Sequence, residues 1–196
     1  MSSELHMRTL LDLSGAFAGL MFILVGGMLS SGLLVPIQST QSQILALPST
    51  WQVPGLLLCS LVCGQRSAVI SAIAYLIIGI FYVPIFHNGG GIDYLKDPSF
   101  GYLIGFIPAA LFCGKFSERN GMNDILLLTA VAIIGIIILH ISGTIGLVIG
   151  HLFNRWDESF VENLYSYSIA PLLGQLALCP AVGALSLILR RIILIE

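Results

Sequence analysis

Residues 125–152 read ILLLTAVAIIGIIILHISGTIGLVIGHL, a run without Asp, Glu, Lys or Arg. As an α-helix rising about 1.5 Å per residue, this run is about 40 Å long, whereas the hydrocarbon core of a bilayer is roughly 30 Å thick. The stretch therefore predicts a membrane-spanning helix that tilts or extends beyond the bilayer.

Five further apolar runs flank this one, separated by charged residues, Pro and Gly. They cover residues 13–36, 53–64, 67–83, 100–116 and 168–195. Hydrophobic residues make up 57% of the chain and charged residues 9%, against about 25% charged in an average soluble domain. We expect an all-α membrane protein with six transmembrane helices, in which residues 1–196 form a single integral membrane domain.

Basic residues predict how these helices are oriented in the bilayer. With six crossings, the turn 64–66, the loop 115–124 and both termini lie on one side. That side carries six of the 8 basic residues, namely Arg8, Arg66, Lys115, Arg119, Arg190 and Arg191. The positive-inside rule then places both termini in the cytoplasm, and we expect the plasma membrane as the location. The net charge is -2, and no basic stripe exists to bind nucleic acid.

The loops expected on the other side hold unusual residues. Residues 36–52 are uncharged and rich in Ser, Thr and Gln, which favours a segment that folds over a small ligand. Residues 88–91 read NGGG, and their unobstructed backbone N–H groups are suited to a ligand carbonyl or carboxylate. On spacing alone, a flexible turn is the alternative interpretation.

Four stretches together resemble one known family. Residues 74–91 read AYLIIGIFYVPIFHNGGG, 97–106 read DPSFGYLIGF, 48–58 read PSTWQVPGLLL and 64–66 read GQR. These stretches resemble the BioY family, the biotin-binding S components of energy-coupling factor (ECF) transporters. The similarity extends over about residues 10–191.

The resemblance implies an S-component-like bundle of six helices, with biotin held near its outer face. By matching position, it implies a substrate-binding site made of Thr50, Gln52, Asn88, Gly89, Gly90, Gly91, Tyr102 and Gln175. It also implies a transmembrane coupling subunit and ATPase subunits on separate chains, since this sequence has no Walker motif. We expect no cofactor and no metal site. Biotin is the expected transported ligand, and we expect the lipid bilayer to surround the protein.

One segment departs from the family pattern. Where the family has Pro-Gly-Asp-x-x-Lys, residues 173–178 read LGQLAL. Gln175 replaces the acid and still donates and accepts hydrogen bonds, while Leu178 removes the lysine. The expected ligand is biotin, with another small vitamin or biotin-related compound as the alternative.

Small residues on the first helix have two interpretations. Gly15, Ala18 and Gly19 allow close approach of another backbone. By the resemblance they contact the coupling subunit, whereas packing inside the bundle produces the same pattern.

An intramembrane enzyme is the alternative from another class. Its candidate residues, His140, Ser142, Cys59 and Cys113, form no recognisable catalytic motif. We therefore expect no catalytic residue and no enzyme, and we interpret His140 as a neutral, hydrogen-bonded core residue.

Overall fold

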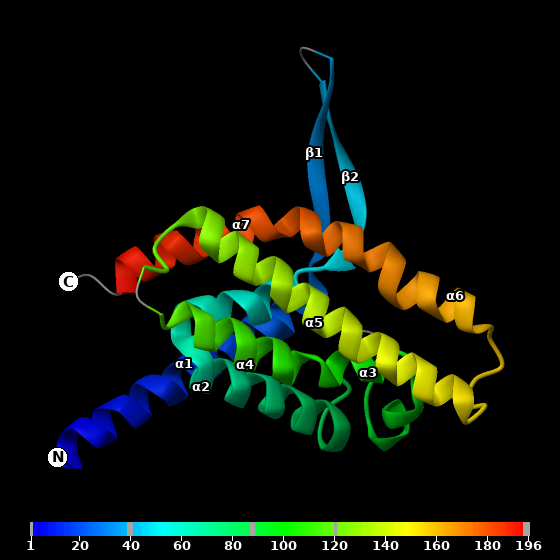
Figure 1. The fold of residues 1–196 in the computed structure, drawn as a ribbon, viewed down its shortest axis with the longest axis horizontal. Coiled ribbons are helices and arrows are strands. Elements are labelled where there is room, and N and C mark those ends of the chain that lie inside the picture. Colours follow the sequence, from blue (N-terminus) through cyan, green and yellow to red (C-terminus); the bar gives the residue numbers. More distant parts are fainter. Residues whose placement is uncertain (1, 39–40, 87–88, 120, 194–196) are drawn as a thin grey trace.

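The computed structural model describes residues 2–38, 41–86, 89–119 and 121–193 and consists mainly of helices (Figure 1). The helices are α1 (Ser2–Met28), α2 (Gln52–Phe81), α3 (Phe100–Ile104), α4 (Phe106–Ser117), α5 (Ile125–Leu152), α6 (Phe160–Leu164) and α7 (Ala170–Ile193). A short 3-10 helix, η1 (Ile92–Lys96), and a π-helix, η2 (Tyr165–Ile169), complete the helical elements. Two strands, β1 (Ser30–Gln38) and β2 (Gln41–Thr50), form an antiparallel hairpin.

Five helical stretches in the described part of the chain are long and apolar enough to cross a membrane. They are His6–Met28, Gln52–Phe81, Phe100–Ser117, Ile125–Leu152 and Phe160–Ile193. Six runs were expected from the sequence. The difference lies in α2, which joins the two expected runs 53–64 and 67–83 in one element.

The helix α2 consists of two antiparallel legs, residues 52–63 and 65–81, that meet at Gly64. This glycine has φ 83° and ψ -177°, a conformation outside the helical region. Cys59 Sγ lies 3.7 Å from Ser71 Oγ, although twelve residues of continuous helix span about 18 Å. The predicted turn at 64–66 is therefore present within α2.

The expected helix over 13–36 is wrong beyond Met28, because the chain continues there into the hairpin. Gly32 and Pro36 are both poor helix formers, and a two-stranded hairpin has only edge strands, where proline is tolerated. The all-α description therefore holds for the bundle, and the hairpin stands away from it (Figure 1). Its base is closed by Ser31 Oγ, which donates to the Ser49 carbonyl at 2.6 Å.

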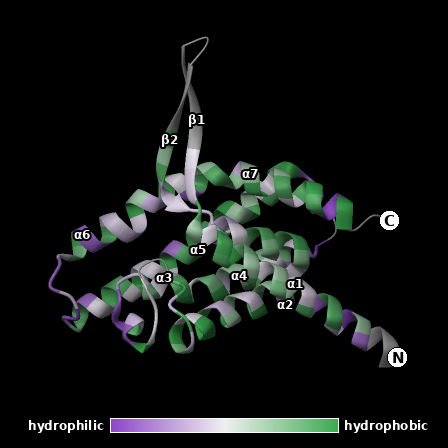
Figure 2. Ribbon diagram, turned by 180° about the vertical axis from the view of Figure 1, so that it is seen from behind, coloured by the Kyte–Doolittle hydropathy of each residue, from purple (hydrophilic) through white to green (hydrophobic). Residues whose placement is uncertain are grey.

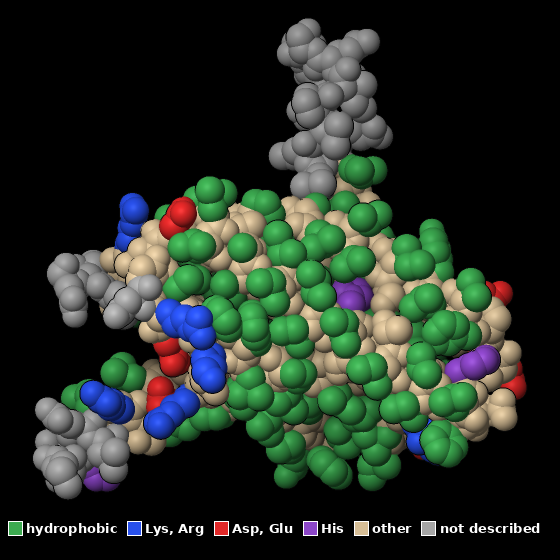
Figure 3. All heavy atoms as spheres, in the orientation of Figure 1, with side chains coloured by type: hydrophobic (Ala, Val, Ile, Leu, Met, Phe, Trp, Pro, Cys, Tyr) green, Lys and Arg blue, Asp and Glu red, His purple; other side chains and the backbone are tan. Residues whose placement is uncertain are grey.

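The surface of the bundle is apolar, as suits a protein surrounded by lipid. On α5 the buried face carries Gly135, His140 and Gly143. The exposed face carries a row of isoleucines, namely Ile134, Ile137, Ile141, Ile145 and Ile149. Hydrophobic side chains cover the visible flank of the molecule (Figure 3), and hydrophobic residues predominate along most of the helices (Figure 2). A water-soluble helix shows the opposite arrangement.

Both ends of the chain lie at the same end of the bundle, where most Lys and Arg side chains on the visible face gather (Figures 1 and 3). Arg190 on α7 is partly buried at this end. Its guanidinium donates to the Leu61 carbonyl at 2.8 Å and to the Ser117 carbonyl at 3.0 Å. These carbonyls lie in the last turns of the first α2 leg and of α4, so one cation caps two helix ends.

Replacing Arg190 by Met should destabilise the bundle. The substitution keeps a long apolar side chain but leaves both carbonyls without their charged donor, a loss of roughly 2 kcal/mol or more. We expect a lower apparent unfolding temperature in detergent, measured by intrinsic fluorescence. Arg191→Met, at the exposed neighbouring position, is the matched control and should leave that temperature unchanged. Equal losses in both variants would contradict the capping role.

Candidate functional site

A cavity of about 450 Å³ lies where the base of the hairpin meets α2, α3, α5 and the start of α7. Its volume is within the range of small-molecule sites. Polar side chains from six regions of the chain line it: Ser30, Ser49, Thr50, Gln52, Tyr94, Ser99, Tyr102, His140, Ser166, Tyr167 and Gln175. Apolar walls come from residues such as Leu103, Phe106 and Leu139. The site is thus apolar in body, with converging polar groups.

Four side chains, Tyr102, Ser168, His140 and Gln175, form a continuous polar chain along one wall. The Oε1 atom of Gln175 can only accept, so His140 donates its Nε2–H to it at 3.0 Å. The His140 Nδ1 atom then accepts from the Ser168 hydroxyl at 3.2 Å, and that hydroxyl accepts from Tyr102 at 2.9 Å. A neutral imidazole therefore satisfies every member, in agreement with the interpretation of His140 as a neutral core residue.

The side-chain amides of the two glutamines in the cavity differ in whether their N–H groups already have partners. Gln52 donates from Nε2 to the Tyr75 hydroxyl at 2.5 Å, and Tyr75 donates to the Ile85 carbonyl at 3.2 Å. Gln52 is thereby connected, through Tyr75, to the backbone at Ile85. The Gln175 amide nitrogen makes no hydrogen bond within the part of the protein that the structure describes. Its two N–H donors are available to a ligand.

The π-helix η2 brings further polar groups to the cavity. Within Tyr165–Ile169, Ser166 and Tyr167 line the cavity and Ser168 joins the polar chain. Short π-helical segments inside α-helices are frequent at functional sites. The apolar pattern did not predict this segment, because the last expected run begins only at residue 168.

Tyr102 owes its position to glycines on the neighbouring helix. A Cβ atom at Gly143 would overlap the Tyr102 ring, and one at Gly101 would lie 3.0 Å from the Gly146 Cα. The absence of side chains at these positions lets α3 lie directly against α5. The phenol hydroxyl thereby reaches Ser168 on η2.

The structure brings together four of the residues expected at the substrate site. Thr50, Gln52, Tyr102 and Gln175 all line this cavity, although they are far apart in the sequence. Sequence reasoning missed Tyr94, Ser99, Ser166, Tyr167 and Ser168 as site residues. Tyr94 and Ser99 both follow the glycine segment 88–91 within eight residues, and this proximity was the available signal.

The glycines 89–91 do not line the cavity. They form a turn against the end of α2: the Gly91 N–H donates to the Gly79 carbonyl at 2.8 Å, and Gly89 exchanges two backbone bonds with Phe86. A Cβ at Gly90 would lie 2.6 Å from the Pro84 Cα. Asn88 lies outside the described residues. A ligand contact for this segment stays a prediction.

Two of the small residues on α1 pack inside the bundle. A Cβ at Gly15 would lie 2.8 Å from Ser67 Oγ, and one at Gly19 would overlap Cys59. Close packing of α1 on α2 therefore accounts for both glycines. Ala18 is only partly buried. Contact of these residues with a coupling subunit stays a prediction.

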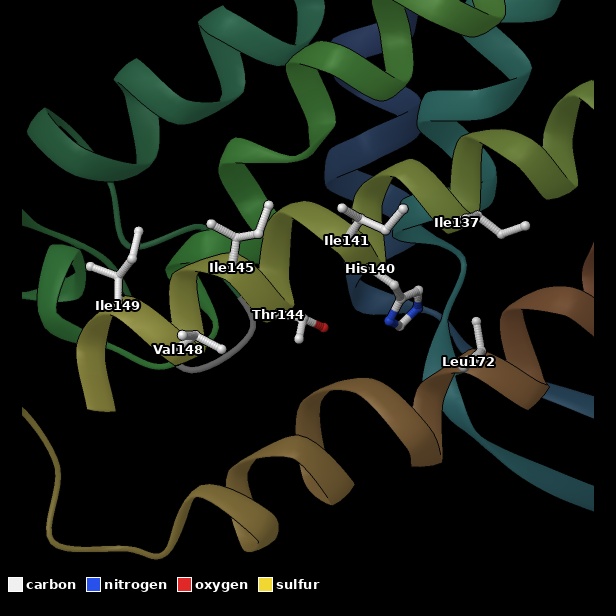
Figure 4. Close-up of a pocket in the computed structure, with 8 residues that line it drawn as sticks. All are labelled: Ile137, His140, Ile141, Thr144, Ile145, Val148, Ile149 and Leu172. Carbon is white, nitrogen blue, oxygen red and sulfur yellow. The ribbon is translucent and has the colours of Figure 1, made fainter. Parts of the chain in front are cut away.

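A second hollow, of about 460 Å³, lies on the lipid-facing side between α5 and α7 (Figure 4). It is lined by isoleucines and other apolar residues, with His140 and Thr144 pointing from α5 toward Leu172 of α7. His140 lines both hollows. Because the outer hollow has few polar groups and is open to lipid, the polar cavity is the candidate binding site.

Comparison with known proteins connects the whole chain to one family. The model of the BioY family matches residues 6–194. An uncharacterized 21.2 kDa protein of Cyanophora paradoxa is 32% identical over 156 residues, which cover 79% of this chain and 80% of that protein.

Relatives with a stated activity match shorter segments. The probable biotin transporter BioY of Lysinibacillus sphaericus is 42% identical over 72 residues, 37% of each chain. The biotin transporter BioY of Thermotoga maritima is 34% identical over 91 residues, 46% of this chain and 54% of that one. The matches thus span from about a third to about half of the length of these two transporters.

A solved structure has the same fold. The S-component for biotin from an ECF-type ABC transporter superposes with a TM-score of 0.61 at 18% sequence identity, covering 94% of this chain and 93% of that chain. This likeness confirms the S-component-like fold expected from the sequence.

Replacing Gly143 by Ala should disturb the cavity wall. The added methyl group must displace the Tyr102 ring, at a cost of about 1–3 kcal/mol. We expect a lower apparent unfolding temperature in detergent. The matched control is Gly27→Ala, where the nearest atom to an added Cβ lies at 3.8 Å, so that temperature should stay unchanged or rise slightly. A Gly143→Ala protein as stable as the control would contradict this packing.

Proposed function

Because this chain belongs to the BioY family, we propose that it is a membrane subunit that binds biotin outside the cell and delivers it inward. The predicted family membership is confirmed, and the family is one of transporters rather than enzymes. The observation that carries the proposal is the convergence of Thr50, Gln52, Tyr102 and Gln175 on one cavity of suitable size.

The chemistry of the cavity fits the ureido ring of biotin, which presents one carbonyl oxygen and two N–H groups. The unused N–H donors of Gln175 are suited to the carbonyl oxygen, and hydroxyl groups such as those of Thr50 and Tyr167 are suited to accept from the ring N–H groups. Phe106 and Leu103 supply apolar area for the sulfur-containing ring and the alkyl chain.

Placement in the membrane follows from the distribution of charge. If each α2 leg crosses the bilayer, the six segments leave both termini on one side, as in the positive-inside arrangement. We propose that the end with Arg66, Lys115 and Arg119 faces the cytoplasm, in the plasma membrane. This end would then meet a transmembrane coupling subunit and ATPase subunits on separate chains, with Gly15, Ala18 and Gly19 on α1 near the coupling subunit.

Purified protein in detergent should bind biotin, measured by isothermal titration calorimetry. Gln175→Ala removes the proposed donors to the ureido oxygen and also leaves His140 without its acceptor, so we expect affinity to fall at least tenfold. Gln65→Ala, a glutamine in the turn region at the opposite end of the bundle, is the matched control and should keep wild-type affinity.

Wild-type protein that binds no biotin would refute the proposal. Competition with dethiobiotin, lipoate and thiamine then tests the alternative, another small vitamin or a biotin-related compound.

The orientation can be tested with a pair of exposed cysteines. Lys96→Cys and Arg66→Cys lie at opposite ends of the bundle, with the native side chains 76% and 81% exposed. A membrane-impermeant maleimide should label Lys96→Cys in intact cells and Arg66→Cys only after permeabilisation. The wild type, whose four cysteines lie within helical spans, gives the background. The reverse pattern would overturn the proposed orientation.

A further inference from the structure

The lining of the cavity has no charged side chain among the residues that the structure describes. Its polar members are hydroxyls, amides and one imidazole. Biotin carries an ionised carboxylate at neutral pH, and a carboxylate that leaves water without a cationic partner loses several kcal/mol of hydration. The cavity therefore offers the carboxylate no compensating charge.

A charge in direct contact with the lining has the wrong sign for a carboxylate. Asp97 Oδ1 accepts from the backbone N–H of Ser99 at 2.8 Å and from its hydroxyl at 2.6 Å. Ser99 itself lines the cavity. The neighbouring cation, Lys96, is 76% exposed and forms an ion pair with Asp93 at 3.2 Å. An anion at this edge of the cavity meets a carboxylate first.

His140 is the one imidazole of the lining, and both its nitrogens are already engaged. One donates to Gln175 and the other accepts from Ser168. The Tyr102 ring lies edge-on to it, with ring centroids 5.7 Å apart. Both ring nitrogens are thus occupied by partners within the wall, so neither has an N–H free to donate to a ligand carboxylate.

Building on the proposed function, we propose that this cavity selects the neutral part of biotin and gains nothing from its carboxylate. The ureido oxygen and N–H groups match the amides and hydroxyls of the wall, and the carboxylate stays in water or is held at a cost. Neutral derivatives with the same ring system are then bound at least as tightly as biotin. The substrate class widens to biotin amides and esters.

Displacement of radiolabelled biotin from the full-length protein in detergent at neutral pH tests this. The competitors are biotin, biotinamide and biotin methyl ester. In biotinamide an NH2 group replaces one of the two carboxylate oxygens, so the molecule is neutral and of nearly the same size. We expect a ratio of Kd for biotinamide to Kd for biotin of one or less. Biotinamide binding tenfold weaker than biotin would overturn the inference while leaving the proposed function intact. Failure of all three compounds to bind would overturn both.

Two surface variants test whether a cation outside the lining holds the carboxylate. Lys96→Met and Arg155→Met remove the basic residues at the cavity end of the bundle, and both lie at exposed positions where folding is little affected. We expect the same Kd ratio as in the wild type. A tenfold loss of biotin affinity in either variant, without a change for biotinamide, would show an ion pair with the carboxylate and overturn the inference.

Discussion

A hydrocarbon environment offers no hydrogen bonds, so the polar groups of this bundle depend on partners within the protein. The requirement is most demanding at a helix end that is buried among other helices. The first α2 leg, residues 52–63, is about 18 Å long, and its last carbonyls have no partner within the leg. Arg190 reaches across from α7 to the Leu61 carbonyl, and Glu118 accepts from the Gln65 N–H beyond the turn. Capping between helices thus makes a short helix possible here.

The same requirement organises the cavity. Tyr102, Ser168, His140 and Gln175 come from α3, η2, α5 and α7, and each is buried while bonded to the next. This polar chain connects the four segments to one another and leaves the amide nitrogen of Gln175 available to the proposed ligand. The wall proposed to recognise the ligand is therefore also a connection between helices, so changes at these positions should affect both binding and stability.

Apolar length and charge spacing sufficed to predict most of the helices, because both follow directly from the bilayer. Apolar length and charge spacing gave wrong predictions where the conformational preference of individual residues determines the secondary structure. The hairpin, in which Gly32 and Pro36 interrupt an otherwise apolar run, looked like a continuation of α1. The π-helical turn at Ser168 depends on tertiary contacts that leave no periodic trace in the sequence. Family resemblance located Thr50, Gln52, Tyr102 and Gln175, whereas Tyr94 and Tyr167 become visible as site residues only once the chain is folded.

His140 faces the polar cavity on one side and the lipid-facing hollow on the other (Figure 4). In the proposed mode of binding, a ligand in the polar cavity and an acyl chain in the outer hollow would contact the same imidazole. The surrounding lipid would then form an outer layer of the binding site, and the thickness and fluidity of the bilayer would become variables of recognition.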